Sequence, residues 1–144
     1  MEPAARRRLE EVLDREIEVA RSLAETLAAE RNALTGDSPE AVERRAADKI
    51  RILQAIEELE TERRKLCPSP GASGIAATVA ERWRALMELM AGCRSANEVN
   101  GQIIHVRQYQ IRQLIDIIRG GGPSLTYGPQ GKTFAKALRA LARA

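Results

Sequence analysis

The chain has 144 residues and a formal net charge of +3; charged residues make up 30% of it and aromatic residues only 3%. This length allows one domain with a modest core. The scarcity of aromatic residues argues against β-rich folds, and the abundance of Ala, Glu, Leu and Arg is typical of long helices or coiled coils. The sequence shows no apolar signal region and no apolar stretch long enough to span a membrane, so we expect a cytoplasmic protein without membrane insertion.

The charge is unevenly distributed along the chain. Residues 1–66 hold 16 acidic and 13 basic residues, a net charge of −3, whereas residues 67–144 hold 4 acidic and 10 basic residues, a net charge of +6. A basic segment is compatible with nucleic acid, a membrane surface or an acidic protein groove, and the sign alone does not choose among them. The two cysteines, Cys67 and Cys93, are too few for a disulfide framework, so we expect reduced thiols.

The first two predicted helices cover residues 3–35 and 38–66. Pro3 and Pro39 suit the first helical position, Gly36 ends the first helix, and Ser38 is a capping residue for the second. The loop between them is so short that the second helix must fold back antiparallel to the first. The first helix has an apolar seam at alternating spacings of four and three, formed by Leu13, Ile17, Ala20, Ala24, Leu27 and Leu34.

The second helix has an apolar side and a charged side. We expect its inner face to consist of Val42, Ala46, Ile50, Leu53, Ile56, Leu59 and Leu66. The charged run of Glu57, Glu58, Glu60, Glu62, Arg63 and Arg64 is expected to form the solvated outer face. Two prolines and two glycines between Cys67 and Gly74 then predict a loop.

The third predicted helix covers residues 75–119 and carries a seven-residue apolar repeat. Trp83, Met90, Asn97, Ile104, Ile111 and Ile118 form one line of the repeat, and Val79, Leu86, Cys93, Asn100, Arg107 and Leu114 form the other. Asn97 and Asn100 therefore fall on predicted core positions, with Gly101 next to them. One interpretation is a buried polar layer that fixes helix register; the other is a docking site for the tail or a partner helix, and the two are compatible.

The lengths of the helices suggest an uncovered surface. At about 1.5 Å per residue the first two helices reach roughly 45 Å and the third roughly 65 Å, so the third should extend beyond the turn at Gly36. Its far half is rich in apolar residues: Ile103, Ile104, Val106, Ile111, Leu114, Ile115, Ile117 and Ile118. An uncovered apolar stretch of this kind predicts a partner surface or a self-association surface.

The last segment begins with a glycine hinge at residues 120–122. It holds Tyr127, which is either an ordinary turn tyrosine or an interface anchor. A short amphipathic helix is predicted over residues 132–144, with Lys132, Lys136, Arg139 and Arg143 on one side and Phe134, Leu138 and Leu141 on the other. The predicted architecture is therefore all-α: an antiparallel bundle or coiled coil of three long helices over residues 1–119, followed by a flexible partner-binding segment over residues 120–144.

The sequence offers no catalytic centre. Gly131-Lys132-Thr133 is not a phosphate-binding loop, because Thr126 occupies the position of the required first glycine and no strand precedes it. His105 is the only histidine, which leaves too few ligands for a metal site or a catalytic triad, and we expect it to be a partly exposed helix residue. We therefore expect neither an enzyme nor a bound cofactor or metal.

Two short motifs resemble those of the FlgN-type flagellar export chaperones. The segment Asn97-Glu98-Val99-Asn100-Gly101-Gln102-Ile103-Ile104 is similar to the family's N-x-x-N-G-x-x-I signature. The segment Tyr127-Gly128-Pro129-Gln130-Gly131 resembles its Y-G-P-x-G segment. The glycine hinge and the basic tail match no family pattern.

The resemblance implies a cytoplasmic chaperone of type III secretion that binds the hook–filament junction proteins FlgK and FlgL and delivers them to the export gate. It implies cargo binding at Ile104, Ile111, Ile115, Ile118, Phe134, Leu138 and Leu141, and docking to the gate protein FlhA at Tyr127. Asn97, Asn100 and Gly101 would set the register. One alternative is a structural coiled-coil adaptor that forms a homodimer; a nucleic-acid-associated helical protein is disfavoured by the acidic first two helices.

Overall fold

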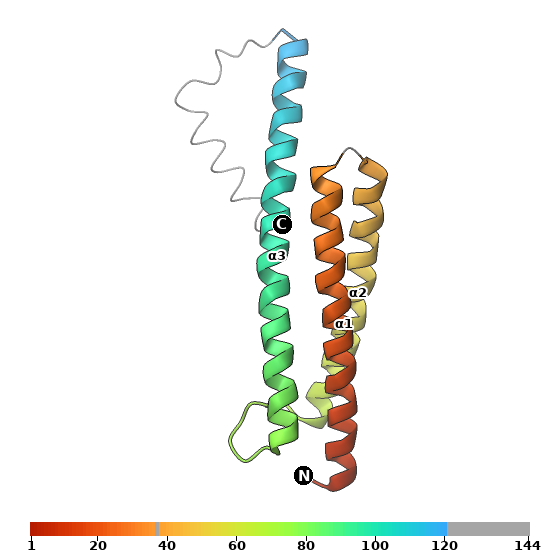
Figure 1. Cartoon of the computed structure of the whole chain (residues 1–144), viewed down its shortest axis with the longest axis vertical. Helices are drawn as coiled ribbons and strands as arrows, with labels where there is room; N and C mark the ends of the chain where they lie inside the picture. The colour runs from red at the N-terminus through yellow and green to blue at the C-terminus, as the bar shows by residue number, and fades with distance from the viewer. Residues whose placement is uncertain (37, 121–144) are drawn as a thin grey trace. The chain divides into compact units, whose positions relative to one another are not determined.

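The computed structural model describes residues 1–36 and 38–120, and the regular structure of these residues is entirely helical. Helix α1 runs over Pro3–Thr35, α2 over Pro39–Leu66 and α3 over Ala77–Ile118 (Figure 1). Pro3 and Pro39 stand at the starts of their helices, and the hydroxyl of Ser38 accepts a hydrogen bond from the backbone N–H of Ala41 at 3.2 Å. The helix bounds lie within two residues of those predicted.

The chain divides into two compact units, Met1–Ala96 and Asn97–Ala144, and the boundary falls inside α3. The predicted boundary at residue 119 depends on residues 121–144, which lie outside the described ranges. That boundary and the predicted helix over residues 132–144 stay predictions.

The core of the first unit consists of buried side chains of α1 and α3 together with Cys67, and partly buried side chains of α2 pack against it. One cluster gathers Leu9, Leu13, Ile17, Ala20, Cys67, Val79 and Leu86, and a second gathers Leu23, Leu27 and Cys93. α1 contributes most of these residues, in agreement with its predicted seam. The free thiols of Cys67 and Cys93 are both buried, and burial raises the pKa of the Cys93 thiol.

Polar contacts between the helices of the first unit show the directions in which the helices run relative to one another. Arg8 of α1 pairs with Glu62 of α2, and Glu30 of α1 pairs with Lys49 of α2 at 2.9 Å. These pairs run in opposite order along the two helices, as the short connecting loop requires. In contrast, the contacts between α1 and α3 follow the same order along both helices. Asp14 of α1 pairs with Arg82 near the start of α3 at 2.8 Å, and Arg31 of α1 donates to the carbonyl of Ala96, further along α3, at 3.5 Å.

The predicted inner face of α2 is partly wrong. Ile50 and Leu53 are exposed, with 57% and 44% of their surface accessible, whereas Arg63 is buried at 6%. Ile56, which was predicted for the inner face, packs against the core together with Ile52, which was not. The ion pairs of Lys49 and Arg63 with α1 lie on the stripe of Ile52, Ile56 and Leu59, whereas Ile50 and Leu53 lie beside it.

A candidate interaction surface at the end of the third helix

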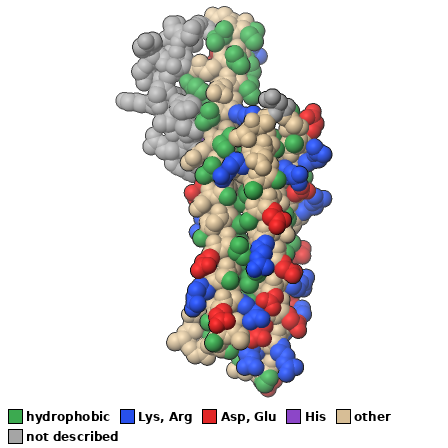
Figure 2. Space-filling view, in the orientation of Figure 1, with side chains coloured by type: hydrophobic (Ala, Val, Ile, Leu, Met, Phe, Trp, Pro, Cys, Tyr) green, Lys and Arg blue, Asp and Glu red, His purple; other side chains and the backbone are tan. Residues whose placement is uncertain are grey.

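The end of α3 is an uninterrupted helix with apolar side chains exposed to solvent. No glycine or proline occurs between Gly101 and Gly120. At Gly120 a backbone φ of +83° ends the helix, since this conformation disfavours residues with a Cβ atom. Five apolar residues of the last two turns are exposed: Ile111, Leu114, Ile115, Ile117 and Ile118, the last at 82%. We call these five residues the terminal face; hydrophobic side chains gather at this end of α3 in Figure 2.

Within residues 111–118, the apolar and the polar residues occupy different heptad positions. Ile111 and Ile118 occupy position a, Leu114 position d, Ile115 position e and Ile117 position g. The remaining positions, b, c and f, hold Arg112, Gln113 and Asp116. A helix with such a division buries its apolar side against another element in most proteins, so its exposure here makes the terminal face a candidate interaction surface.

The predicted cargo-binding residues fall into three groups. Ile111, Ile115 and Ile118 belong to the terminal face, whereas Ile104 is half-buried. The other three, Phe134, Leu138 and Leu141, lie outside the described residues. Tyr127, the predicted gate-docking residue, also lies outside them.

The two asparagines of the signature differ in burial. Asn100 is fully buried, as its core position predicts, but Asn97 is exposed. The prediction of a core position for Asn97 is therefore wrong, because burial depends on what packs around a residue and not on its heptad position alone. Gly101 is half-buried. The role of these residues in register stays a prediction.

His105 is buried, with 3% of its surface accessible, so the expectation of partial exposure is wrong. Its Nε2 atom makes no hydrogen bond in the structure of residues 1–36 and 38–120. Burial and the charge of Arg112 lower the pKa of the imidazole. Among the described residues, no group of His, Cys, Asp and Glu side chains could hold a metal ion.

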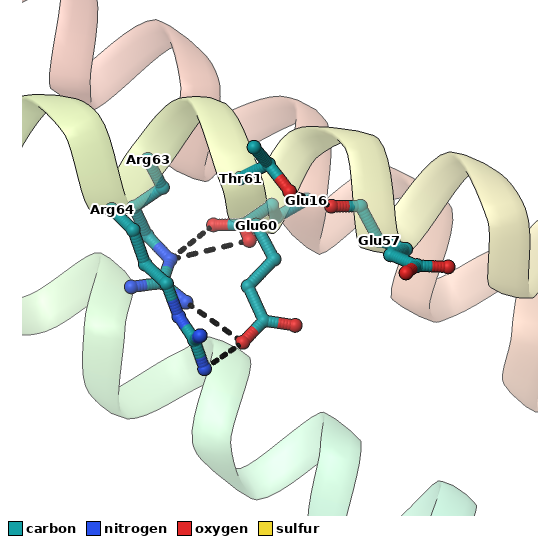
Figure 3. Close-up of polar contacts among 6 residues, drawn as sticks. All are labelled: Glu16, Glu57, Glu60, Thr61, Arg63 and Arg64. Atoms are coloured by element: carbon teal, nitrogen blue, oxygen red, sulfur yellow. Dashed lines mark hydrogen bonds and ion pairs between the residues drawn. The ribbon is translucent and has the colours of Figure 1, made fainter.

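A different arrangement, built on buried charge, ties the first unit together. The Nε atom of Arg63 in α2 donates to both carboxylate oxygens of Glu16 in α1, at 3.2 and 3.0 Å (Figure 3). The guanidinium carbon lies 4.6 Å from the ring centre of Trp83 in α3, within the range of a cation–π interaction. We call Glu16, Arg63 and Trp83 the clasp.

The loop between α2 and α3 packs against the clasp. A Cβ atom on Gly71 would lie 3.1 Å from Nε1 of Trp83, so the loop backbone approaches the indole closely at a residue without a side chain. A carboxylate oxygen of the partly exposed Glu60 lies 4.0 Å from Nη2 of Arg63. Burial raises the pKa of Glu16, the positive charge of Arg63 opposes this effect, and Glu60 adds to it.

The sequence interpretation missed the clasp because it placed Arg63 on the solvated face. One signal was available: Glu16 lies on the same helical arc as Val12, Leu13 and Ala20, which are all buried. A carboxylate on a core arc requires a buried cation from a neighbouring helix. Arg63, one turn after Leu59, was the residue placed to supply it.

A model of the FlgN protein family matches residues 1–134 of the chain. No curated protein and no solved structure gave a match. Within residues 1–36 and 38–120, no helix combines the length and the apolar character needed to cross a bilayer.

Proposed function

Because the chain belongs to the FlgN family of flagellar export chaperones, we propose that it binds the hook–filament junction proteins FlgK and FlgL in the cytoplasm and delivers them to the export gate. The observation that carries this proposal is the terminal face. Five exposed apolar side chains on two turns of one helix can cover an apolar stripe that a cargo helix exposes before assembly.

The chemistry of the terminal face suits holding and release rather than permanent assembly. Specific, stable interfaces bury about 800 Å² per partner, which is more than two helical turns provide. The face alone therefore supports a weak complex. Phe134, Leu138 and Leu141 would add contact area in the complex, and the free energy spent on ordering a partner-bound segment would keep the affinity moderate.

Tyr127 completes the proposal as the residue that docks the loaded chaperone to FlhA. It belongs to the segment that resembles the family's Y-G-P-x-G motif, and it is separate in sequence from the terminal face. Cargo binding and gate docking can therefore be separated by substitution. Tyr127→Ala should retain the cargo and lose export.

The proposal is tested by co-purification of the full chain with FlgK and FlgL from the same bacterium. Replacing Ile111 and Leu114 together by serine should reduce the recovered cargo at least tenfold, because it removes the centre of the apolar face. Met87→Ser is the matched control, since Met87 is an exposed apolar residue of α3 in the first unit. Normal recovery of cargo with the double variant would contradict the cargo site.

The alternative of a structural adaptor predicts a different result in the same experiment. In that case the double variant would convert a homodimer into a monomer, as measured by light scattering, and no junction protein would be recovered with the unaltered chain. The chaperone proposal expects recovery of the junction protein.

A further inference from the structure

The terminal face is wider than one partner helix can cover. At about 100° per residue, its five side chains span an arc of about 160°, from Ile117 on one flank to Ile115 on the other. The apolar core of a two-stranded coiled coil uses positions a and d, here Ile111, Leu114 and Ile118, which span about 60°. Ile115 and Ile117 would each remain beside such a seam, and they are 41% and 51% exposed.

The flanks differ from those of a helix that pairs with a single partner. Positions e and g of two-stranded coiled coils commonly carry Glu and Lys, which form ion pairs across the seam. Here both positions are isoleucine between residues 111 and 118, and the nearest charges, Arg112 and Asp116, occupy positions b and f. One turn earlier the face narrows, because Gln108 and Gln110 occupy positions e and g.

From this width we propose that the terminal face binds two helices of the cargo at once, one along the Ile115 flank and one along the Ile117 flank, and so completes a three-helix bundle. This inference rests on the proposed function and specifies its ligand: a pair of adjacent helices, each with an apolar stripe. With no charged residue on the face itself, apolar packing rather than ion pairing sets the register of the bundle.

Two other occupants would leave one flank open. A second copy of the chain would bring one α3 helix to the face. The chain's own predicted helix over residues 132–144 is likewise a single helix. A cargo that presents two helices covers Ile115 and Ile117 together without a further chain.

The experiment places a photo-crosslinking residue at Ile115 or at Ile117 in the full chain and maps the products with a bound junction protein by mass spectrometry. The expected result is that the two positions crosslink to two different helices of the cargo. Crosslinks from both positions to one cargo helix would overturn the inference. A crosslink from either position to residues 121–144 or to a second copy would do the same.

Affinity measurements give an independent readout. Ile115→Ser and Ile117→Ser should each weaken cargo binding about tenfold, and their effects should multiply in the double variant. Met87→Ser should leave the affinity unchanged, and circular dichroism should show equal helix content in all variants. If either flank variant bound cargo with unaltered affinity, the two-helix arrangement would be wrong while the proposed function stood; absence of any complex with the unaltered chain would overturn both.

Discussion

The two ends of α3 use charge and apolar surface in opposite ways. Near its start, in the first unit, Trp83 packs on Arg63, whose charge is buried with that of Glu16. Near its end, in the second unit, isoleucine and leucine side chains face solvent. Buried charge is costly to separate and so fixes how three helices meet, whereas exposed apolar surface gains free energy only when a partner covers it. We propose that the first arrangement serves the fold and the second serves binding, and substitutions can test this division.

The largest effect on stability is expected at the clasp. Arg63→Ala leaves the Glu16 carboxylate buried without its partner, which should lower the free energy of unfolding by about 3–5 kcal/mol. Arg64→Ala is the matched control, because its side chain is 69% exposed and its ion pair is with the partly exposed Glu60 of the same helix; its effect should stay within about 0.5 kcal/mol. Urea unfolding followed by circular dichroism measures both, and equal losses would show that the clasp does not stabilise the fold.

A pair of leucines extends the comparison to apolar residues. Leu13 is fully buried in the first unit, so Leu13→Ala should cost about 2–5 kcal/mol through lost burial and the cavity that remains. Leu114 on the terminal face is 59% exposed, and Leu114→Ala should change stability by no more than about 0.5 kcal/mol. A large loss of stability with Leu114→Ala would mean that the terminal face is part of the folded core.

The clasp also predicts a pH dependence with a defined sign. Burial raises the pKa of Glu16 above its ordinary value of 4.5 in the folded protein, with Arg63 opposing, so the folded state binds this proton more tightly than the unfolded chain. The stability contributed by that proton is present at low pH and is lost as the pH rises through the folded-state pKa. The difference in unfolding free energy between the unaltered chain and Glu16→Gln should therefore fall as the pH rises from 4; a difference that grows with pH would contradict the raised pKa.

The smallest predicted effects concern two glycines. Gly92 lies inside α3 with open space where a Cβ atom would be, so Gly92→Ala should stabilise the protein by about 0.5–1 kcal/mol. Gly71→Ala should bring no such gain, because its methyl group would press on the indole of Trp83. Calorimetric melting temperatures compare the two variants, and a similar increase for both would mean that the loop does not pack on the clasp.

Local signals predicted the helices well, because their ends are set by residues with one dominant effect. Pro3 and Pro39 start helices and Gly36 stops one, whatever the surroundings. The faces of the helices were harder to predict. On α2, apolar periodicity correctly favoured Ile56 but also favoured Ile50 and Leu53, while the pairing of Lys49 and Arg63 with carboxylates of α1 places Ile52 against the core instead.

The terminal face was predictable because its apolar residues follow from the heptad pattern of a single helix. Asn97 and His105 were misplaced for the opposite reason, since their burial depends on what packs around them and not on their own spacing. The clasp combines three distant segments, and pairing over such separations leaves no periodic trace in the sequence.

Trp83 gives the clasp one more consequence. It is the only tryptophan of the chain, so the intrinsic fluorescence excited at long ultraviolet wavelengths originates from a single indole stacked on a guanidinium. The emission therefore reports the integrity of the first unit and contains no contribution from residues 97–144. A cargo without tryptophan could thus be titrated against the full chain while the tryptophan emission shows whether the first unit stays folded.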